Sequence, residues 1–138
     1  MVHLHHLVNY WAIVVSAIVL WALGALWFSP ALFAKPWVAI VGRQMGEKPK
    51  GVAWGMIASF IGDLLLAFVM AHVIIWSHAA GSWADGLHIG LLTWVGFIAA
   101  TMYPNTIYEG RGARYFMITG GYWLVGFLII GAVLAVWQ

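Results

Sequence analysis

The sequence predicts an all-α integral membrane protein with four transmembrane helices in an up-down bundle. Only 7% of its 138 residues are charged, against about 25% in an ordinary soluble protein. Hydrophobic residues make up 64% and the mean hydropathy is +0.96, more apolar surface than a soluble domain of this size can bury. Four stretches are long enough to cross a bilayer, which takes ~20 apolar residues in a helix.

The composition also excludes several functional classes. A soluble enzyme domain, a nucleic-acid-binding protein and a disordered chain all need more polar residues than this. The net charge of +2 comes from six Lys and Arg against four Asp and Glu, which sets topology and makes no surface for nucleic acid. The chain has no Cys, so disulfides, thiolate metal sites and cysteine catalysis are excluded.

The expected spans belong to one domain covering residues 1–138. They are Val8–Phe28, Val52–Trp76, Gly86–Tyr103 and Phe116–Trp137. Helix is favoured over strand by length, and because backbone groups in a bilayer must bond within their own segment. The first span is expected to stay in the mature protein, since no Lys or Arg of a signal-peptide n-region precedes it. The third is expected to stop at Pro104, where a helix loses a backbone donor.

The long connection Ser29–Gly51 is expected to contain a short interfacial segment. Its middle, residues 31–41, is apolar apart from Lys35, which is typical of a piece lying on the membrane surface. Pro36 predicts that this piece is broken rather than one continuous helix.

The distribution of cations predicts the orientation. All six lie in two connections that four spans place on one side of the membrane: Lys35, Arg43, Lys48, Lys50, Arg111 and Arg114. The positive-inside rule then puts these loops in the cytoplasm and both termini on the outer side of a cell's inner membrane. The chain is also tryptophan-rich, with 10 Trp, and those that lie deep in spans are expected to bond their indole N–H groups inside the bundle.

Asp63 is the sharpest single feature, because it falls near the middle of the second span. An ionised carboxylate there costs about 2.5–3.5 kcal/mol on insertion scales. Helical spacing places it on one stripe with small and apolar residues: Gly55, Ser59, Gly62, Leu66 and Met70. Small residues allow close helix approach, and the polar groups at similar depth are Ser16, Thr93 and Trp94. Asp63 is therefore either a proton or cation site or a hydrogen-bonded acid that holds the bundle together.

The histidines suggest a second kind of site, because all of them fall at or near the predicted outer face. They are His3, His5, His6, His72, His78 and His88. Neutral imidazole binds Zn, Cu or Ni, and short His-rich tracts bind such metals. Asp85 is a possible further ligand, but it is equally well placed as the N-cap of the third span.

His72 has its own alternatives, since a His inside a membrane helix can ligate the metal of a tetrapyrrole. Such a residue can also simply bond to a neighbour. His72 and Asp63 are nine residues apart, which places them on opposite sides of one helix, so they are not expected to form a dyad.

The second basic loop contains the only dense charged run in the second half of the chain, with Glu109, Arg111 and Arg114. A catalytic Glu assisted by Arg is conceivable. A loop salt bridge with two topology-setting cations explains the same residues more simply. The sequence has no P-loop, no dinucleotide fingerprint and no nucleophile elbow, so no enzyme is expected and no cofactor is identified.

Several short motifs recur in an order that resembles a family of small four-helix bacterial membrane proteins, the domain-of-unknown-function 1761 family. These are Asn9-Tyr10, Leu26-Trp27-Phe28-Ser29-Pro30 followed by Leu32-Phe33, Lys35 and Trp37, then Tyr108-Glu109-Gly110-Arg111 and Gly121-Tyr122-Trp123-Leu124. Phe28 stands where the pattern has Tyr, and Thr119-Gly120 where it has an Asn. The resemblance implies four spans and no established activity, and it supplies no catalytic residues.

Three functional hypotheses follow. The first is a non-catalytic membrane protein that forms an oligomer or an accessory subunit of a larger respiratory or photosynthetic type of complex, because four thin helices bury little of their own surface. The second is an oligomeric channel or transporter protomer that uses Asp63. The third is a metal-binding protein that uses the outer histidines. The bilayer is the expected environment in all three.

Overall fold

A computed structural model describes residues 8–138, and every regular element over that range is helical. In chain order these are α1 (Tyr10–Trp27), α2 (Ala34–Ile40), α3 (Val52–Trp76), α4 (Trp83–Thr93), the π-helix η2 (Trp94–Ala99), α5 (Ala100–Tyr108) and α6 (Gly112–Val136). Four segments are long and apolar enough to span a membrane: α1, α3, the continuous helix α4–η2–α5, and α6. The four expected spans are confirmed as helices of this kind.

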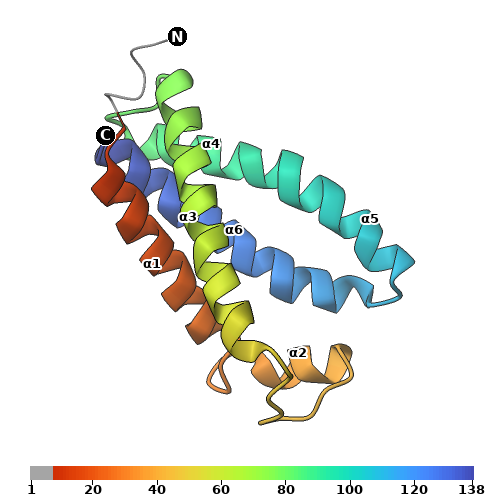
Figure 1. Ribbon diagram of the computed structural model, residues 1–138. Helices are drawn as coiled ribbons and strands as arrows, with labels where there is room; N and C mark the ends of the chain where they lie inside the picture. Colours follow the sequence, from red (N-terminus) through yellow and green to blue (C-terminus); the bar gives the residue numbers. More distant parts are fainter. Residues whose placement is uncertain (1–7) are drawn as a thin grey trace.

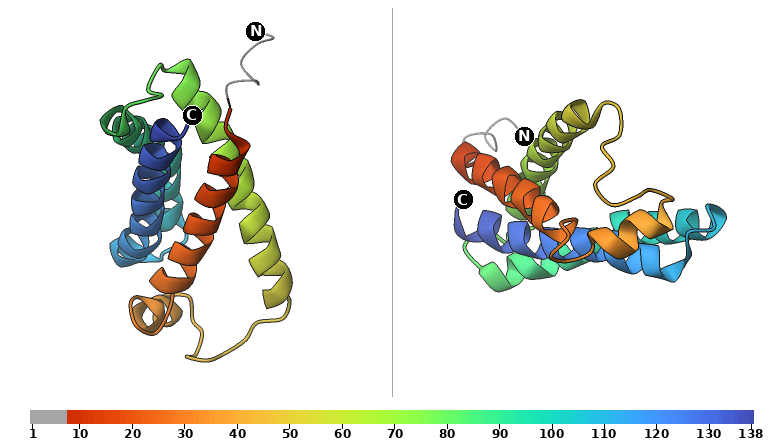
Figure 2. Two further views of the ribbon diagram at one scale, coloured as in Figure 1. Left: turned by 90° about the vertical axis from the view of Figure 1, so that its left-hand side faces the viewer. Right: turned by 90° about the horizontal axis from the view of Figure 1, so that it is seen from below.

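The helices form two antiparallel pairs (Figure 1). α1 packs on α3, α4–η2–α5 packs along α6, and both α1 and α3 contact α6. α1 and α3 diverge toward the end that carries α2 (Figure 2). The arrangement is therefore more open at that end than a parallel-sided bundle.

Both ends of the described chain lie together, opposite α2 and the α5–α6 turn (Figure 1). The backbone N–H of Asn9 donates to Gln138 Oε1 at 2.9 Å, and Asn9 Nδ2 donates to the Trp137 carbonyl at 2.9 Å. The Asn9 side chain also accepts from the N–H groups of Trp11 and Ala12, so this residue caps α1 and ties it to the C-terminal end.

The short segment between the first two spans is a helix, but the expected break at Pro36 is wrong. α2 runs from Ala34 to Ile40 and continues across the proline. Pro36 is the third residue of this helix, and the first N–H groups of any helix have no partner within it. The missing donor therefore costs no hydrogen bond.

The third span does not stop at Pro104 as expected, but continues through it to Tyr108. The π-helix η2 ends one turn before this proline, and its wider hydrogen-bond ladder is one of the local adjustments that accommodate a proline in a span. The hydroxyl of Thr101 donates to the carbonyls of Phe97 at 2.6 Å and Ile98 at 3.2 Å. These carbonyls lie in η2, so a side chain supports the region where the ladder changes.

The tightest helix contact is between α4 and α6, and glycines create it. A methyl group added at Gly86 would collide with the Gly131 carbonyl, and one added at Gly90 would collide with the Phe127 carbonyl. Gly86 and Gly90 are spaced as a small-xxx-small pair, whose role is such backbone approach.

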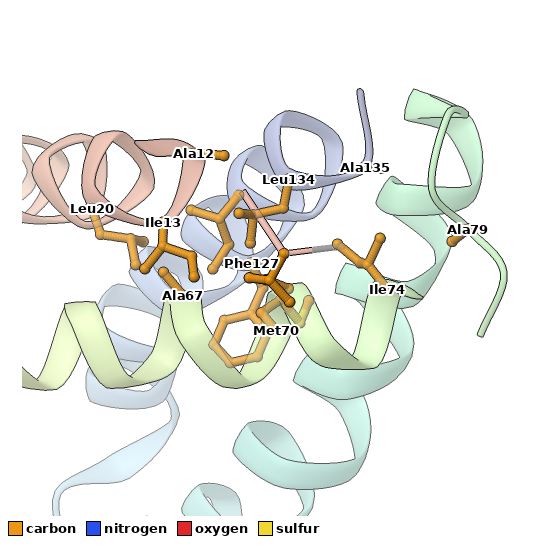
Figure 3. Close-up of a cluster of buried hydrophobic side chains, with 13 residues drawn as sticks. Ala12, Ile13, Leu20, Ala67, Met70, Ile74, Ala79, Phe127, Leu134 and Ala135 are labelled. Carbon is orange, nitrogen blue, oxygen red and sulfur yellow. The ribbon is translucent and has the colours of Figure 1, made fainter. Parts of the chain in front are cut away.

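The expected close approach along the α3 stripe is wrong for its small residues. Nothing lies within 4 Å of a methyl group added at Gly55 or Gly62, and Ser59 is exposed. The neighbouring helices pack instead on Met70 of this stripe and on Ala67 and Ile74 beside it, all three of which lie in the core (Figure 3).

Candidate intramembrane polar site

Asp63 lies in the middle of α3 and is the most unusual buried group in the described chain. The residue is 3% exposed, and its Oδ2 has no hydrogen-bond partner among residues 8–138. The ion pair found within that range joins Arg111 and Glu109 in a loop. Within residues 8–138 the Asp63 carboxyl therefore forms no ion pair with a basic side chain.

Ser16 of α1 lies at the same depth as Asp63, as expected. On one side of this level, Trp21 Nε1 donates to the Met56 carbonyl at 3.2 Å. On the other side, Ile13 lies beside Ala67 in the core (Figure 3). Ser16 lies between Ile13 and Trp21 on α1. Asp63 lies between Met56 and Ala67 on α3, so the two residues fall at the same level.

The Ser16 hydroxyl differs from most other hydroxyls in the spans. Ser59, Thr93, Thr101 and Thr106 each donate to the carbonyl four residues earlier, the usual way to satisfy a hydroxyl within a helix. Ser16 is fully buried, and its Oγ has no partner among the described residues. The hydroxyl therefore retains its hydrogen-bonding capacity at the depth of the Asp63 carboxyl.

The other expected partners of Asp63 bind elsewhere. The Thr93 hydroxyl donates to the Ile89 and Gly90 carbonyls at 2.8 and 3.0 Å, and it lies 3.8 Å from the sulfur of Met70. Met70 is seven residues beyond Asp63, which is ~10 Å along a helix. Trp94 Nε1 donates to the Gly120 carbonyl at 3.0 Å. The expectation that Thr93 or Trp94 bonds the carboxyl is therefore wrong.

Tyr122 of α6 is a further buried polar residue between the helices, and sequence reasoning did not single it out. The residue is 7% exposed, and its hydroxyl donates to the Leu20 carbonyl of α1 at 3.1 Å. A phenol in the middle of an apolar span needs a polar partner, and that signal was available from the sequence.

Two further residues shape this part of the site. A methyl group added at Gly24 would lie 3.2 Å from the Tyr122 hydroxyl oxygen, so the glycine makes room for the phenol. Thr119 lies one turn before Tyr122 on α6, and its buried Oγ1 also has no partner in the described part of the chain. Buried polar side chains are thus present on three helices, α1, α3 and α6.

The histidines do not converge within the described chain. Among residues 8–138, no group of three or more His, Asp or Glu side chains is close enough to hold a metal ion. His3, His5 and His6 lie outside the described residues. His78 follows α3 in a turn and His88 lies inside α4. The proposed metal site thus has no ligand set among the residues that the structure describes.

His72 is held in an aromatic setting. Its Nδ1 lies 2.8 Å from the Phe68 carbonyl, which favours the tautomer that carries the proton on Nδ1. Its ring lies 4.4 Å from that of Phe68 and 5.7 Å from that of Trp76, measured between ring centroids. These contacts are those of a residue packed within its own helix.

Asp85 is not the N-cap of the third span, because α4 begins earlier than expected. Ser82 is the N-cap, and its Oγ accepts from the Asp85 backbone N–H at 3.2 Å. Asp85 lies in the first turn, where a carboxylate interacts favourably with the helix dipole.

The second basic loop forms the expected salt bridge. Arg111 Nε lies 2.9 Å from Glu109 Oε2, and both side chains are partly exposed. The Arg111 guanidinium also lies 4.8 Å from the ring centroid of Tyr115. Arg114 is exposed in the first turn of α6. An exposed pair of this kind contributes little to stability.

The chemistry available at the site follows from its oxygen atoms. When protonated, a carboxyl donates one hydrogen bond, and Asp63 Oδ2 and Ser16 Oγ make no such bond to one another in the structure. When ionised, carboxylate oxygens are ligands of the type that hard cations prefer. A carboxyl in this position is therefore a group that can take up a proton or a cation.

Four helices long and apolar enough to cross a bilayer, with a buried acid in one of them, define a small multi-pass helical membrane protein. The model of a family described as a protein of unknown function, DUF1761, matches residues 11–135, and the chain belongs to this family. No curated protein and no solved structure matches the chain.

Proposed function

We propose that this protein is the protomer of an oligomeric channel or transporter that moves protons or small monovalent cations, with Asp63 as the group that binds them. The observation that carries the proposal is the Asp63 carboxyl, buried at the middle of a span with an oxygen that has no partner within residues 8–138. A polar group in that position is costly and therefore typical of ion and proton pathways.

The absence of a basic neighbour favours a mobile positive charge. All six Lys and Arg lie in the two loops or at their helix ends, so none reaches the middle of a span. A buried carboxylate without a counter-ion is strongly destabilising. A proton or a cation that binds and leaves removes this cost, which is the property a carrier needs.

The oligomeric part of the proposal rests on helix faces that one chain leaves open. The small residues Gly55, Ala58, Ser59 and Gly62 lie on the exposed side of α3, and small residues favour close packing between membrane helices. Four helices are too few to enclose a pathway, so contacts between copies are needed to line one.

The proposed orientation follows the cations. In this arrangement the α2 connection and the α5–α6 turn face the cytoplasm of a cell with an inner membrane, and both termini face outward. The pairing of Asn9 with the C-terminal residues supports placing both ends on one side.

Ion flux into liposomes that contain the purified protein tests this proposal. We expect Asp63→Asn to reduce proton or Na⁺ flux to the level of empty liposomes, because the amide carries no exchangeable charge. The matched control is Glu109→Gln, which removes a carboxylate from the loop ion pair and should leave flux unchanged. Equal flux through the Asp63→Asn and unmodified proteins would reject the transport role.

An accessory subunit of a larger membrane complex is the second candidate. It is favoured by the third span, which contacts mainly α6 within the chain and leaves large side chains such as Phe97 71% exposed. Copurification with defined subunits from the native membrane, together with a normal assembly in Asp63→Asn, would favour this role over transport.

A further inference from the structure

An apolar groove lies between α1 and α3, on the part of the molecule where these helices diverge. It is lined by Ile18 and Trp21 of α1 and by side chains of α3 from Ala53 to Ile61, and its volume is about 610 Å³. This volume falls within the range of pockets that hold small ligands, roughly 300–1,000 Å³. Every lining residue is apolar, so the groove fits a hydrocarbon.

The inner wall of this groove is fixed by one tryptophan. The indole N–H of Trp21 donates to the Met56 carbonyl across the gap at 3.2 Å. The ring of Trp21 also meets that of Phe60 edge to face, with 6.3 Å between centroids. α1 and α3 are thus joined at this level by contacts of Trp21, which also lines the groove.

The length and direction of the groove match one leaflet of a bilayer. Ala53 is the second residue of α3, and Ile61 lies eight residues further on, which is ~12 Å along a helix. Half of a hydrocarbon core of about 30 Å is ~15 Å. The groove therefore runs from the end of the span to near the middle of the membrane, as an acyl chain does.

The open end of the groove is basic. Lys48 and Lys50 directly precede α3 and are exposed, and Arg43 lies in the same connection. None of them forms an ion pair within residues 8–138. The carboxylate of Glu47, which lies among them, accepts a hydrogen bond from the Gln44 backbone N–H. The connection that leads into this end of α3 thus has a net charge of +2 from Arg43, Lys48 and Lys50 against Glu47.

We propose that the groove binds one acyl chain of an anionic phospholipid and that Lys48 and Lys50 bind its phosphate headgroup. Juxtamembrane clusters of Lys and Arg attract anionic lipid in this way. The charge also argues against a second copy as the occupant, because a symmetric contact through this groove would bring the lysines of both copies together. The site is separate from Asp63, and it does not depend on the transport role.

Native mass spectrometry of the purified protein tests this assignment, with titrations of phosphatidylglycerol and of phosphatidylcholine that carry identical acyl chains. We expect one phosphatidylglycerol molecule to bind tightly and phosphatidylcholine to bind more weakly. The double variant Lys48→Gln with Lys50→Gln should weaken phosphatidylglycerol binding about 25-fold, at roughly a factor of five per cation, and should leave phosphatidylcholine unchanged. The matched control is Arg114→Gln, in the other basic loop, which should keep the preference.

A second variant tests the groove itself. Ala53→Phe places a ring in the groove and should remove the bound lipid, whereas Ala100→Phe, at an exposed position of α5, should not. Equal binding of the two lipids by the unmodified protein would overturn the proposal. So would a dimer that binds no lipid and dissociates in Ala53→Phe, because the groove would then hold a second copy.

Discussion

The two interfaces of α6 are built on opposite principles. Toward α4, α6 meets glycines, the backbones touch, and the nearby polar groups are bonded: the Trp94 indole to the Gly120 carbonyl and the Thr93 hydroxyl to carbonyls of its own helix. Toward α1 and α3, α6 contributes Phe127, Ile130 and Leu134 to the apolar core, and on the α1 and α3 side the buried oxygens of Ser16 and Asp63 lack partners within the described residues. The contact with α4 is suited to stabilising the fold. The side that contains Asp63 is suited to reversible binding of a proton or a cation.

The largest effect is expected at the glycine interface. Gly131→Leu places a side chain against the backbone of Gly86. The substitution fits only if α4 and α6 move apart. Overpacking costs about 1–3 kcal/mol and occasionally more. Because the clash here is with backbone atoms, the loss of stability should be at or above the upper end of this range. The free energy of unfolding in mixed detergent micelles measures it.

Gly62→Leu is the matched control for this comparison. It makes the same substitution in the middle of α3, where nothing lies within 4 Å. The monomer should lose no stability, because leucine is a better helix former than glycine. Similar losses in both variants would show that the α4–α6 contact has no special role.

A smaller effect of opposite sign is expected at the polar interface. Asp63→Leu replaces a buried polar group that has an unpartnered oxygen with an apolar side chain of similar size. Leaving such a group unsatisfied costs about 1–3 kcal/mol, so the variant should be more stable by about that amount while losing flux. A variant less stable than the unmodified protein would indicate that Asp63 holds the helices together instead.

The smallest expected changes in the free energy of unfolding are those of variants at Tyr122 and Ser16. Tyr122→Phe removes the hydrogen bond to the Leu20 carbonyl and should cost about 1 kcal/mol. Ser16→Ala removes a hydroxyl with no partner among residues 8–138 and should change the free energy of unfolding by less than about 0.5 kcal/mol. Finding the larger loss for Ser16→Ala in the same detergent assay would show that its hydroxyl is bonded in the folded protein.

The positions of the spans were predictable from the sequence, but the faces they use were not. Length and apolar composition fix where a chain crosses a bilayer. A span that is apolar on every side carries little information about its rotation, and this is why Gly55 and Gly62 were expected in a contact that α3 makes through another strip. The depth of Ser16 relative to Asp63 was predictable, because depth depends only on distance along each helix.

The prolines were misjudged for a different reason. The effect of a proline depends on its position within the helix and on the turn before it. Pro36 falls in a first turn, and Pro104 follows a π-helical turn. A phenol such as that of Tyr122 within an apolar span indicates that a polar partner is present, but the partner itself, the Leu20 carbonyl, is a backbone group that no sequence pattern marks.

Infrared difference spectroscopy of the Asp63 carboxyl tests the central claim most directly. The chain contains two aspartates, Asp63 and Asp85, so isotope-labelled aspartate with the Asp85→Asn variant isolates one group. The account predicts a protonated-carboxyl band at low pH that is lost when the pH is raised or when Na⁺ is added, and that is absent in Asp63→Asn. A band that persists unchanged at every pH and cation concentration would contradict it, because Asp63 would then be a permanent structural acid.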